Sequence, residues 1–235
     1  IYIENAKFGL ISAHSVCPAF NYLLNNYTCN PLGVIHTSHY FEQFSNDILL
    51  DVPIGFDIEI QDVKAGKERT RIGIHINIKQ QDTLIGVVIS YFSIQGYVNI
   101  KNMNGIRPII ETMVYDDFTF KPTKNVVFNV PASGLLYSEV SGDYNPIHNI
   151  KEFATFAHLE DTLVHGMWTV SCILSEPKKI TKGLVEFKNP LKYNEHLHLQ
   201  SEYNLWSRGQ NVCNTIARDG QGLEILSAKL LIQSP

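Results

Sequence analysis

The hydrophobic pattern changes along the chain from the period of a helix to the period of β-strands, and this order occurs twice. Residues 15–25 space their apolar side chains three or four positions apart, as on one face of a helix. Pro18 fits such a helix only in its first turn, so Ser15 is the predicted N-cap. Residues 71–79 (RIGIHINIK) instead alternate isoleucine with other residues, as in a half-buried strand. The strands predicted for this half are 34–44, 55–63, 70–80 and 84–95.

The second half repeats the order and adds further helices. A helix over 132–140 should end near Gly142, since glycine readily adopts the positive φ of a helix C-terminus. Asn149 and Glu152 have the spacing of a capping box, which predicts a helix over 150–157, and another helix is expected over 167–175. The predicted strands of this half are 126–130, 183–187, 196–206, 211–218 and 223–233.

Each half of the chain has a helix followed by about four strands with short turns. This repeated order predicts an α+β protein of two hot-dog units. In each unit an antiparallel sheet wraps a helix, and pairing of the two sheets into one continuous sheet would cover an open edge of each. We expect an N-terminal unit at 1–100, a linker at 101–118 and a C-terminal unit at 119–235.

Composition excludes several classes of function. The net charge is −4 and the basic residues are scattered, so we expect no nucleic-acid surface. No apolar run is long enough for a spanning helix, so we expect no membrane contact. The four cysteines form no CxxC pair and the first residues lack the pattern of a signal peptide, which favours free thiols and a cytoplasmic protein.

One short stretch, SGDYNPIH at residues 141–148, contains an acid, an amide, a proline and a histidine within eight positions. Asn145 and Pro146 favour a bend, and a bend can bring the side chains of Asp143 and His148 to one point. A carboxylate beside an imidazole is suited to proton transfer, because each group shifts the pKa of the other. A turn with a histidine that caps the next helix explains the same residues, and the spacing alone favours neither interpretation.

The stretch VSGDYNPIH, followed by Ala154 and by VHGMW at 164–168, resembles the two signature blocks of the MaoC-type dehydratases, the (R)-specific enoyl-CoA hydratase family. This resemblance covers roughly 128–175, and the strands that follow fit the family's pattern. Residues 1–100 match no motif. They resemble only the N-terminal half of the family's two-hot-dog members, in which that half helps to accommodate the acyl chain.

The resemblance implies a hydro-lyase of fatty acid metabolism that adds water reversibly to a trans-2-enoyl thioester and forms the (3R)-hydroxyacyl thioester. The family's catalytic pair falls on Asp143 and His148, and its loop-supporting asparagine falls on Asn145. Gly166 falls where the family binds the thioester carbonyl through a backbone N–H, which agrees with the free N–H groups at the start of a helix. The substrate would be a thioester of CoA or of an acyl-carrier protein, and no cofactor is implied.

Other residues of the second block are supporting candidates. His165 should fix the start of the helix through a hydrogen bond, and Met167 lies beside it. Ser171 could face substrate, although a helical serine more commonly bonds its own backbone. One position departs from the family, because Ile150 stands where many members have an acidic residue.

The remaining histidines and lysines give weaker signals. His36 and His39 are spaced wrongly for one face of a strand, and His196 and His198 alone make a poor metal site, so we expect no metal. Basic residues are expected at the mouth of the site, where they would bind the phosphates of a CoA or carrier substrate. The candidates are Lys182, Lys188, Lys192 and Arg208.

Two other functions and a further level of assembly are compatible with the sequence. Hot-dog folds also host thioesterases, which release a free thiol. A catalytically silent acyl-binding module would bind ligand without turnover, although the intact Asp143 and His148 pair argues against it. A homodimer is a further possibility.

Overall fold

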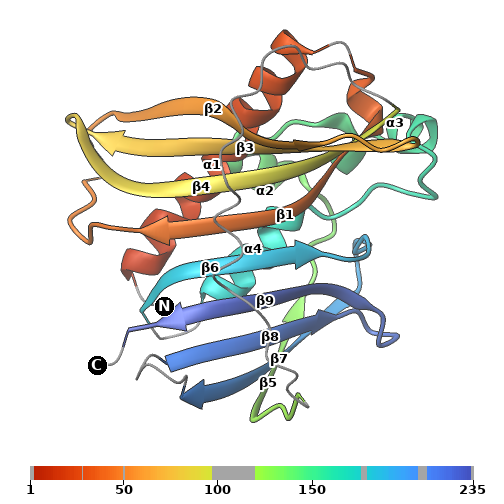
Figure 1. Cartoon of the computed structure of the whole chain (residues 1–235). Helices are drawn as coiled ribbons and strands as arrows, with labels where there is room; N and C mark the ends of the chain where they lie inside the picture. Colours follow the sequence, from red (N-terminus) through yellow and green to blue (C-terminus); the bar gives the residue numbers. More distant parts are fainter. Residues whose placement is uncertain are drawn as a thin grey trace.

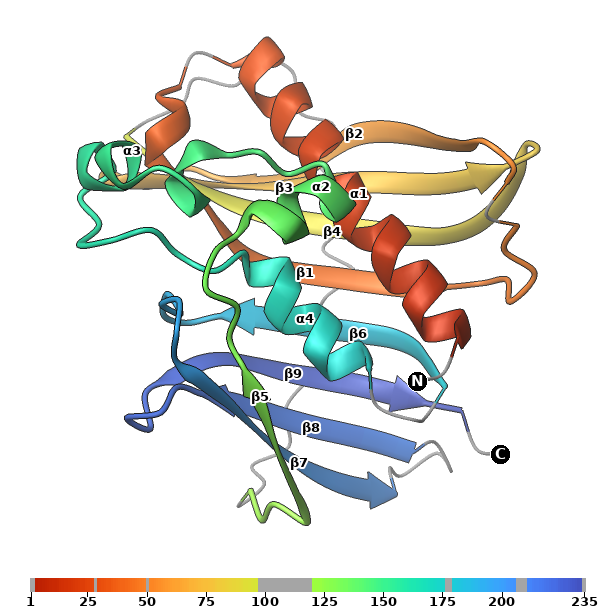
Figure 2. The same ribbon diagram turned by 180° about the vertical axis from the view of Figure 1, so that it is seen from behind.

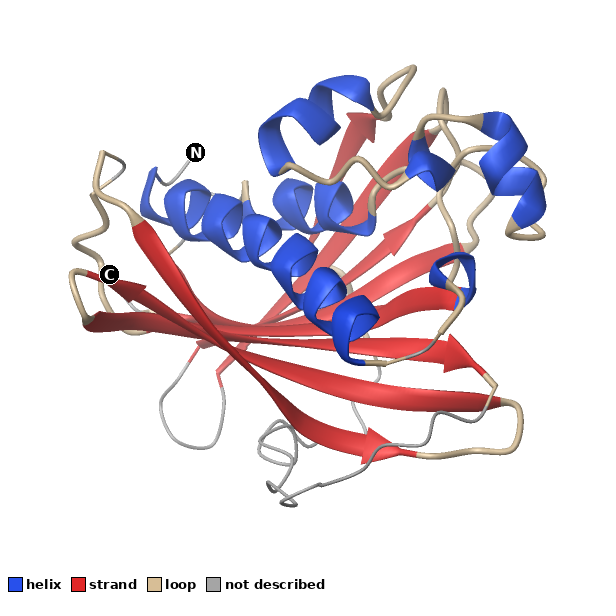
Figure 3. Cartoon of the chain, turned by 90° about the horizontal axis from the view of Figure 1, so that it is seen from above, coloured by secondary structure: helices blue, strands red, loops and turns tan. Residues whose placement is uncertain are grey.

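The chain folds into one curved antiparallel sheet with its helices gathered on one face (Figures 1 and 3). This computed structural model describes residues 3–27, 29–49, 51–96, 120–175, 179–205 and 211–233. The predicted linker at 101–118 and the candidate Arg208 lie outside these residues.

The elements follow the predicted order closely. The first half consists of α1 (Ile3–Asn26), β1 (Val34–Gln43), β2 (Ile54–Lys64), β3 (Arg69–Gln80) and β4 (Thr83–Gln95). The second half begins with β5 (Lys124–Asn129), α2 (Leu135–Ser141), a short 3₁₀ helix (Pro146–His148), α3 (Lys151–Phe156) and α4 (Gly166–Leu174). It ends with β6 (Ile180–Phe187), β7 (His196–Leu205), β8 (Asn211–Arg218) and β9 (Glu224–Ile232).

Within the described residues, the two halves form one continuous nine-stranded sheet, as predicted. The strand order is β2-β3-β4-β1-β6-β9-β8-β7-β5, so the halves join where β1 pairs antiparallel with β6. In this pairing His39 lies opposite Val185. The junction covers one edge of each half-sheet, which removes two rows of unpaired backbone groups.

The core lies between the sheet and the two long helices, α1 and α4, which lie across the same face (Figure 2). The alternating isoleucines of β3 all point into this core and are fully buried. The two helices approach closely at Gly9, where an added Cβ would lie 2.9 Å from Cδ1 of Leu174. Among the described residues, no helix has the length and apolar character needed to cross a bilayer.

Helix α1 corrects the first predicted helix start. It begins at Ile3 rather than after Ser15, and Pro18 lies in its interior. The Ser15 hydroxyl donates a hydrogen bond to the Ser12 carbonyl, 2.7 Å away, so Ser15 is not an N-cap. Burial of Phe8 and other apolar residues of the first turns offsets the roughly 3 kcal/mol that an interior proline costs.

Strand β1 corrects the interpretation of its two histidines. A bulge between His36 and Ser38 shifts the pairing with β4 by one residue, so His36 and His39 point to the same face of the sheet. Their rings meet edge to face with centroids 5.5 Å apart. Alternation along a strand fails at a bulge, because one extra residue reverses the direction of every later side chain.

Candidate active site

The loop between α2 and α3 is a bend closed by its own side chains. Gly142 ends α2 with a φ of 74°, the left-handed conformation predicted for it. Oδ1 of Asp143 accepts a hydrogen bond from the Asn145 N–H (3.0 Å), and Oδ1 of Asn145 accepts one from the Ile147 N–H (3.3 Å). These two successive turns, with the fixed φ of Pro146, explain why the chain reverses here.

The bend places the side chains of Asp143 and His148 close to that of His165, which precedes α4. One ligand atom from each of the three side chains lies within 4.8 Å of the other two. The first two residues come from the loop itself, and His165 comes from the second sequence block. The predicted convergence of a carboxylate and an imidazole is therefore present in the structure.

Backbone contacts fix the orientation and the tautomer of His148. Its Nδ1 lies 2.8 Å from the Leu163 carbonyl oxygen, which can only accept a hydrogen bond, so Nδ1 carries the proton. The lone pair of Nε2 is then free to accept a proton. Burial lowers the pKa of His148, and the Asp143 carboxylate and the bond to Leu163 partly oppose this shift.

His165 stacks on His148, with ring centroids 3.9 Å apart and 26° between the planes. Its Nε2 donates to the backbone carbonyl of Asp143 (3.1 Å), so the residue at the start of α4 is held by a hydrogen bond, as predicted; the bond runs to the loop of Asp143, and His165 gives no side-chain cap to α4. Burial and the neighbouring His148 lower the pKa of His165 to about 4. Stacked rings direct their lone pairs in nearly parallel planes, which does not suit two nitrogens that must converge on one metal ion.

Asn149 supports the site through a hydrogen bond to a residue distant in the sequence, and it does not cap α3. Its Nδ2 donates to Oγ of Ser138 (3.0 Å), which in turn lies 3.3 Å from Nε2 of His165. The N-cap of α3 is Ile150, which provides no side-chain cap, so the predicted capping box is wrong. Asn149 bonds Ser138 on α2, eleven residues away in the sequence, rather than the N-terminus of α3. This bond is preferred because it satisfies a buried hydroxyl group.

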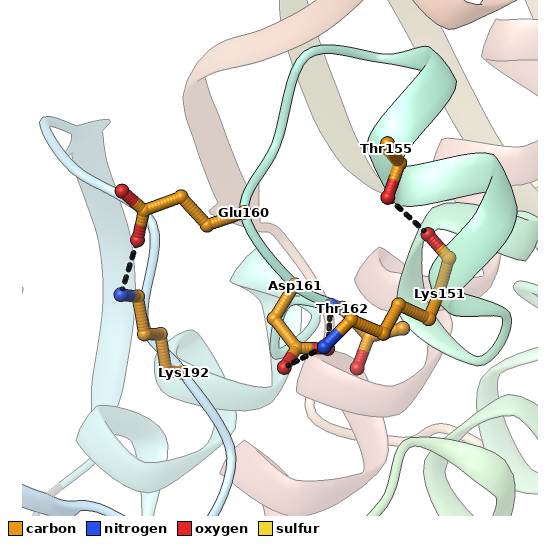
Figure 4. Close-up of polar contacts among 6 residues, drawn as sticks. All are labelled: Lys151, Thr155, Glu160, Asp161, Thr162 and Lys192. Atoms are coloured by element: carbon orange, nitrogen blue, oxygen red, sulfur yellow. Dashed lines mark hydrogen bonds and ion pairs between the residues drawn. The ribbon is translucent and has the colours of Figure 1, made fainter.

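The loop between α3 and α4 carries Leu163 and is anchored on both sides. The Leu163 N–H donates to the Ile147 carbonyl (3.3 Å) and the Val164 N–H donates to the Leu191 carbonyl (2.9 Å). At the exposed end of the loop, Lys151 pairs with Asp161 (3.1 Å) and Lys192 pairs with Glu160 (2.9 Å), as Figure 4 shows. These contacts position the carbonyl that orients His148.

Gly166 begins α4, as predicted, so its N–H has no acceptor within the helix. A Cβ added here would lie 2.9 Å from Cε1 of Phe187, which makes glycine the residue that fits. Met167 is buried in the core beside it. The hydroxyl of Ser171 donates to the Trp168 carbonyl (2.6 Å) on an exposed part of the helix, the local alternative considered for it.

Several residues around the site have no sequence signal of their own. The Tyr193 hydroxyl donates to the His148 carbonyl (3.0 Å). On α1, burial and the Asp143 carboxylate raise the pKa of the Cys17 thiol to about 12. The three described lysines that are candidates for phosphate binding each pair with an acidic residue: Lys182 with Glu42, Lys188 with Glu186 and Lys192 with Glu160.

This site lies on a fold that known proteins share. The chain has a TM-score of 0.72 to peroxisomal multifunctional enzyme type 2 of Drosophila melanogaster, at 18% identity, over 94% of this chain and 40% of that one. A MaoC-like dehydratase of Phytophthora capsici gives 0.69 at 16% identity, over 88% and 74% of the two chains. A Mycobacterium tuberculosis protein described as a double hotdog fold gives 0.64 at 9% identity, over 95% and 80%. The chain is therefore a double hot-dog protein.

Sequence comparison finds relatives for the segment that bears the site. Residues 111–203 match the model of the MaoC like domain. The fatty acid synthase beta subunit hexB of Dothistroma septosporum is 27% identical over 175 residues, which is 66% of this chain and 9% of that protein. The fatty acid synthase subunit beta of Schizosaccharomyces pombe is 43% identical over 68 residues, 28% of this chain and 3% of that one. The chain thus spans less than a tenth of the length of these relatives.

Proposed function

We propose that the chain is a hydratase/dehydratase of fatty acid metabolism that adds water reversibly to trans-2-enoyl thioesters and forms the (3R)-hydroxyacyl thioester. The observation that carries this proposal is the convergence of Asp143 and His148 beside the N-terminus of α4. The MaoC-like domain over 111–203 and the fatty acid synthase relatives support the same reaction class.

In the proposed reaction the thioester carbonyl accepts a hydrogen bond from the Gly166 N–H, where the positive end of the helix stabilises the enolate. Asp143 and His148 hold the attacking water. Its oxygen bonds to C3 as the C2–C3 π bond breaks, the pair takes one proton from the water, and the pair then delivers one proton to C2. The site regains its protonation state over the cycle, and no oxidant, metal or further cofactor takes part.

The substrate in this proposal is a thioester of CoA or of an acyl-carrier protein, and the N-terminal half accommodates the acyl chain. A cytoplasmic location and the pairing of two copies stay predictions from the sequence.

The test is hydration of crotonyl-CoA, followed by loss of the enoyl absorbance and by chiral analysis of the product. Asp143→Asn and His148→Gln should each lower kcat by at least about a thousandfold, because the two residues act as one unit. Asp82→Asn in the β3–β4 turn and His196→Gln on β7 are matched controls that should keep wild-type rates.

The same assay separates the alternatives. Near-wild-type turnover in either site variant, or an (S)-hydroxyacyl product, contradicts the proposal. Release of free CoA without hydration indicates a thioesterase, and binding without turnover indicates a silent acyl-binding module.

A further inference from the structure

The N-terminal half contributes the polar side chain of His36 to the surroundings of the candidate active site. His36 lies on β1, and the bulge before Ser38 turns it toward the face of the sheet that the helices cover. Its ring stacks on Phe92, with centroids 5.0 Å apart and 28° between planes, and lies 5.0 Å from the ring of Phe187 at 50°. The ring is thus held between aromatic side chains of β4 and β6.

Phe187 connects His36 to the catalytic segment. Its ring packs against Gly166, the residue whose N–H is proposed to bind the thioester carbonyl. The Asp143 carboxylate also acts on His36, because it partly opposes the effect of burial, which lowers the pKa of His36 to about 4. His36 is therefore one aromatic ring away from the start of α4 and within electrostatic reach of the catalytic carboxylate.

One atom of His36 is buried and has no hydrogen-bond partner, namely Nε2. The neighbouring His39 is different, because its Nε2 meets Oγ of Ser12 (2.7 Å) and its Nδ1 meets Oγ of Ser90 (3.1 Å). Both ring nitrogens of His39 thus have hydrogen-bond partners, whereas Nε2 of His36 on the same strand has none. A buried polar atom without a partner destabilises the fold, so its retention calls for an explanation such as a ligand.

We propose that His36 is a specificity-determining residue whose Nε2 hydrogen-bonds an oxygen on the acyl chain of the substrate. This inference rests on the proposed hydration reaction. A chain whose carbonyl is held at Gly166 reaches past Phe187 with the carbons that follow the double bond. The preferred substrate class is then a 2-enoyl thioester with a hydroxyl group on C4, C5 or C6. A neutral imidazole suits such a group, since a hydroxyl both donates and accepts.

The test compares trans-hex-2-enoyl-CoA with its 4-hydroxy, 5-hydroxy and 6-hydroxy derivatives as substrates for hydration. For at least one hydroxy derivative, wild-type kcat/KM should exceed that for hexenoyl-CoA by about tenfold or more. A gain of this size is expected when a buried polar atom acquires a hydrogen-bond partner. His36→Phe keeps a flat ring of similar size and should remove this preference while it keeps or improves turnover of hexenoyl-CoA. His36→Gln keeps a polar atom and should retain part of the preference.

His75→Phe is the matched control, because His75 alternates with the core isoleucines of β3, pairs with Glu59 and lies on the other face of the sheet. It should leave the preference unchanged, and thermal melting should show that all variants fold. Equal or better use of hexenoyl-CoA by the wild type, or an unchanged preference in His36→Phe, overturns the inference but leaves hydration standing. Absence of hydration with all four thioesters overturns the proposed function and this inference with it.

Discussion

The imidazole of His148 stacks on that of His165 at a centroid distance of 3.9 Å, and the two rings have different hydrogen-bond partners. His148 donates from Nδ1 to Leu163, and His165 donates from Nε2 to the backbone of Asp143. The stack thus joins the segment before α4 to the loop that carries the carboxylate. It keeps the two members of the proposed catalytic pair in a fixed relative position, and this arrangement leads to four predictions.

The first prediction concerns Gly166. In Gly166→Ala the new methyl group meets the Phe187 ring at 2.9 Å, so the start of α4 must shift. A displacement of about 1 Å at a reacting group costs on the order of 100-fold in rate, and we expect a loss of that size in kcat for crotonyl-CoA hydration. The double variant with Phe187→Leu should recover much of the loss, because the smaller side chain makes space. No recovery would show that crowding by Phe187 is not the cause.

A second prediction concerns Gly134, which precedes α2. An added Cβ would touch the Tyr193 hydroxyl and would lie 2.8 Å from Oδ1 of Asn149 and 2.9 Å from Cε1 of His165. Gly134→Ala should therefore lower hydratase activity by at least about tenfold through displacement of these supporting side chains. Gly220→Ala is the control, since nothing lies within 4 Å of its added Cβ. Equal rates in the two variants would argue against this role of the supporting side chains.

The dependence of activity on pH gives a third prediction. Burial lowers the pKa of His148 below 6.5, and the unprotonated form presents the free Nε2. The value of kcat/KM should therefore hold as the pH falls through 6.5 and decline only at lower pH. A pH–rate profile of the free enzyme measures this directly. An acidic limb with its midpoint above 6.5 would contradict the assignment.

The fourth prediction concerns stability. The pKa of His165 is about 4 in the folded protein and 6.5 in an unfolded chain, so between these values the unfolded state binds more protons. The free energy of unfolding should fall as the pH is lowered from 6.5 toward 4, by up to about 1.4 kcal/mol per pH unit from this group. Denaturant unfolding at several pH values checks the slope. His165→Phe keeps a ring for the stack but cannot titrate, so its slope should be smaller; an equal slope would assign the effect to other groups.

The sequence could predict much of the fold because its signals are local. Period-two alternation in β3, a glycine at the end of α2 and the short turn after β8 depend on neighbours within a few residues. The bend of residues 141–148 is of the same kind, since Asp143 and Asn145 bond backbone groups two residues ahead. The bend was therefore accessible from local signals, whereas the roles expected for Asp143, His148 and Gly166 came from the resemblance of the two sequence blocks to a known family.

The errors occur where a distant partner competes with a local one. Packing on the sheet extends α1 through Pro18, and Ser138 attracts the side chain that the capping box assigned to α3. A bulge places His36 on the same face as His39 because β1 must match both β4 and β6. These outcomes depend on contacts between elements that no window of the sequence contains.

By itself the sequence determined the two-unit α+β fold, the order of its elements and the bend of residues 141–148, because backbone preference and hydrophobic period act over short distances. Only the tertiary structure decided that β1 and β6 join the halves, that Leu163 sets the tautomer of His148, and that His36 of the N-terminal half lies beside Phe187. Each of these is a contact between residues far apart in the chain, and the burial of the whole core determines which of them form.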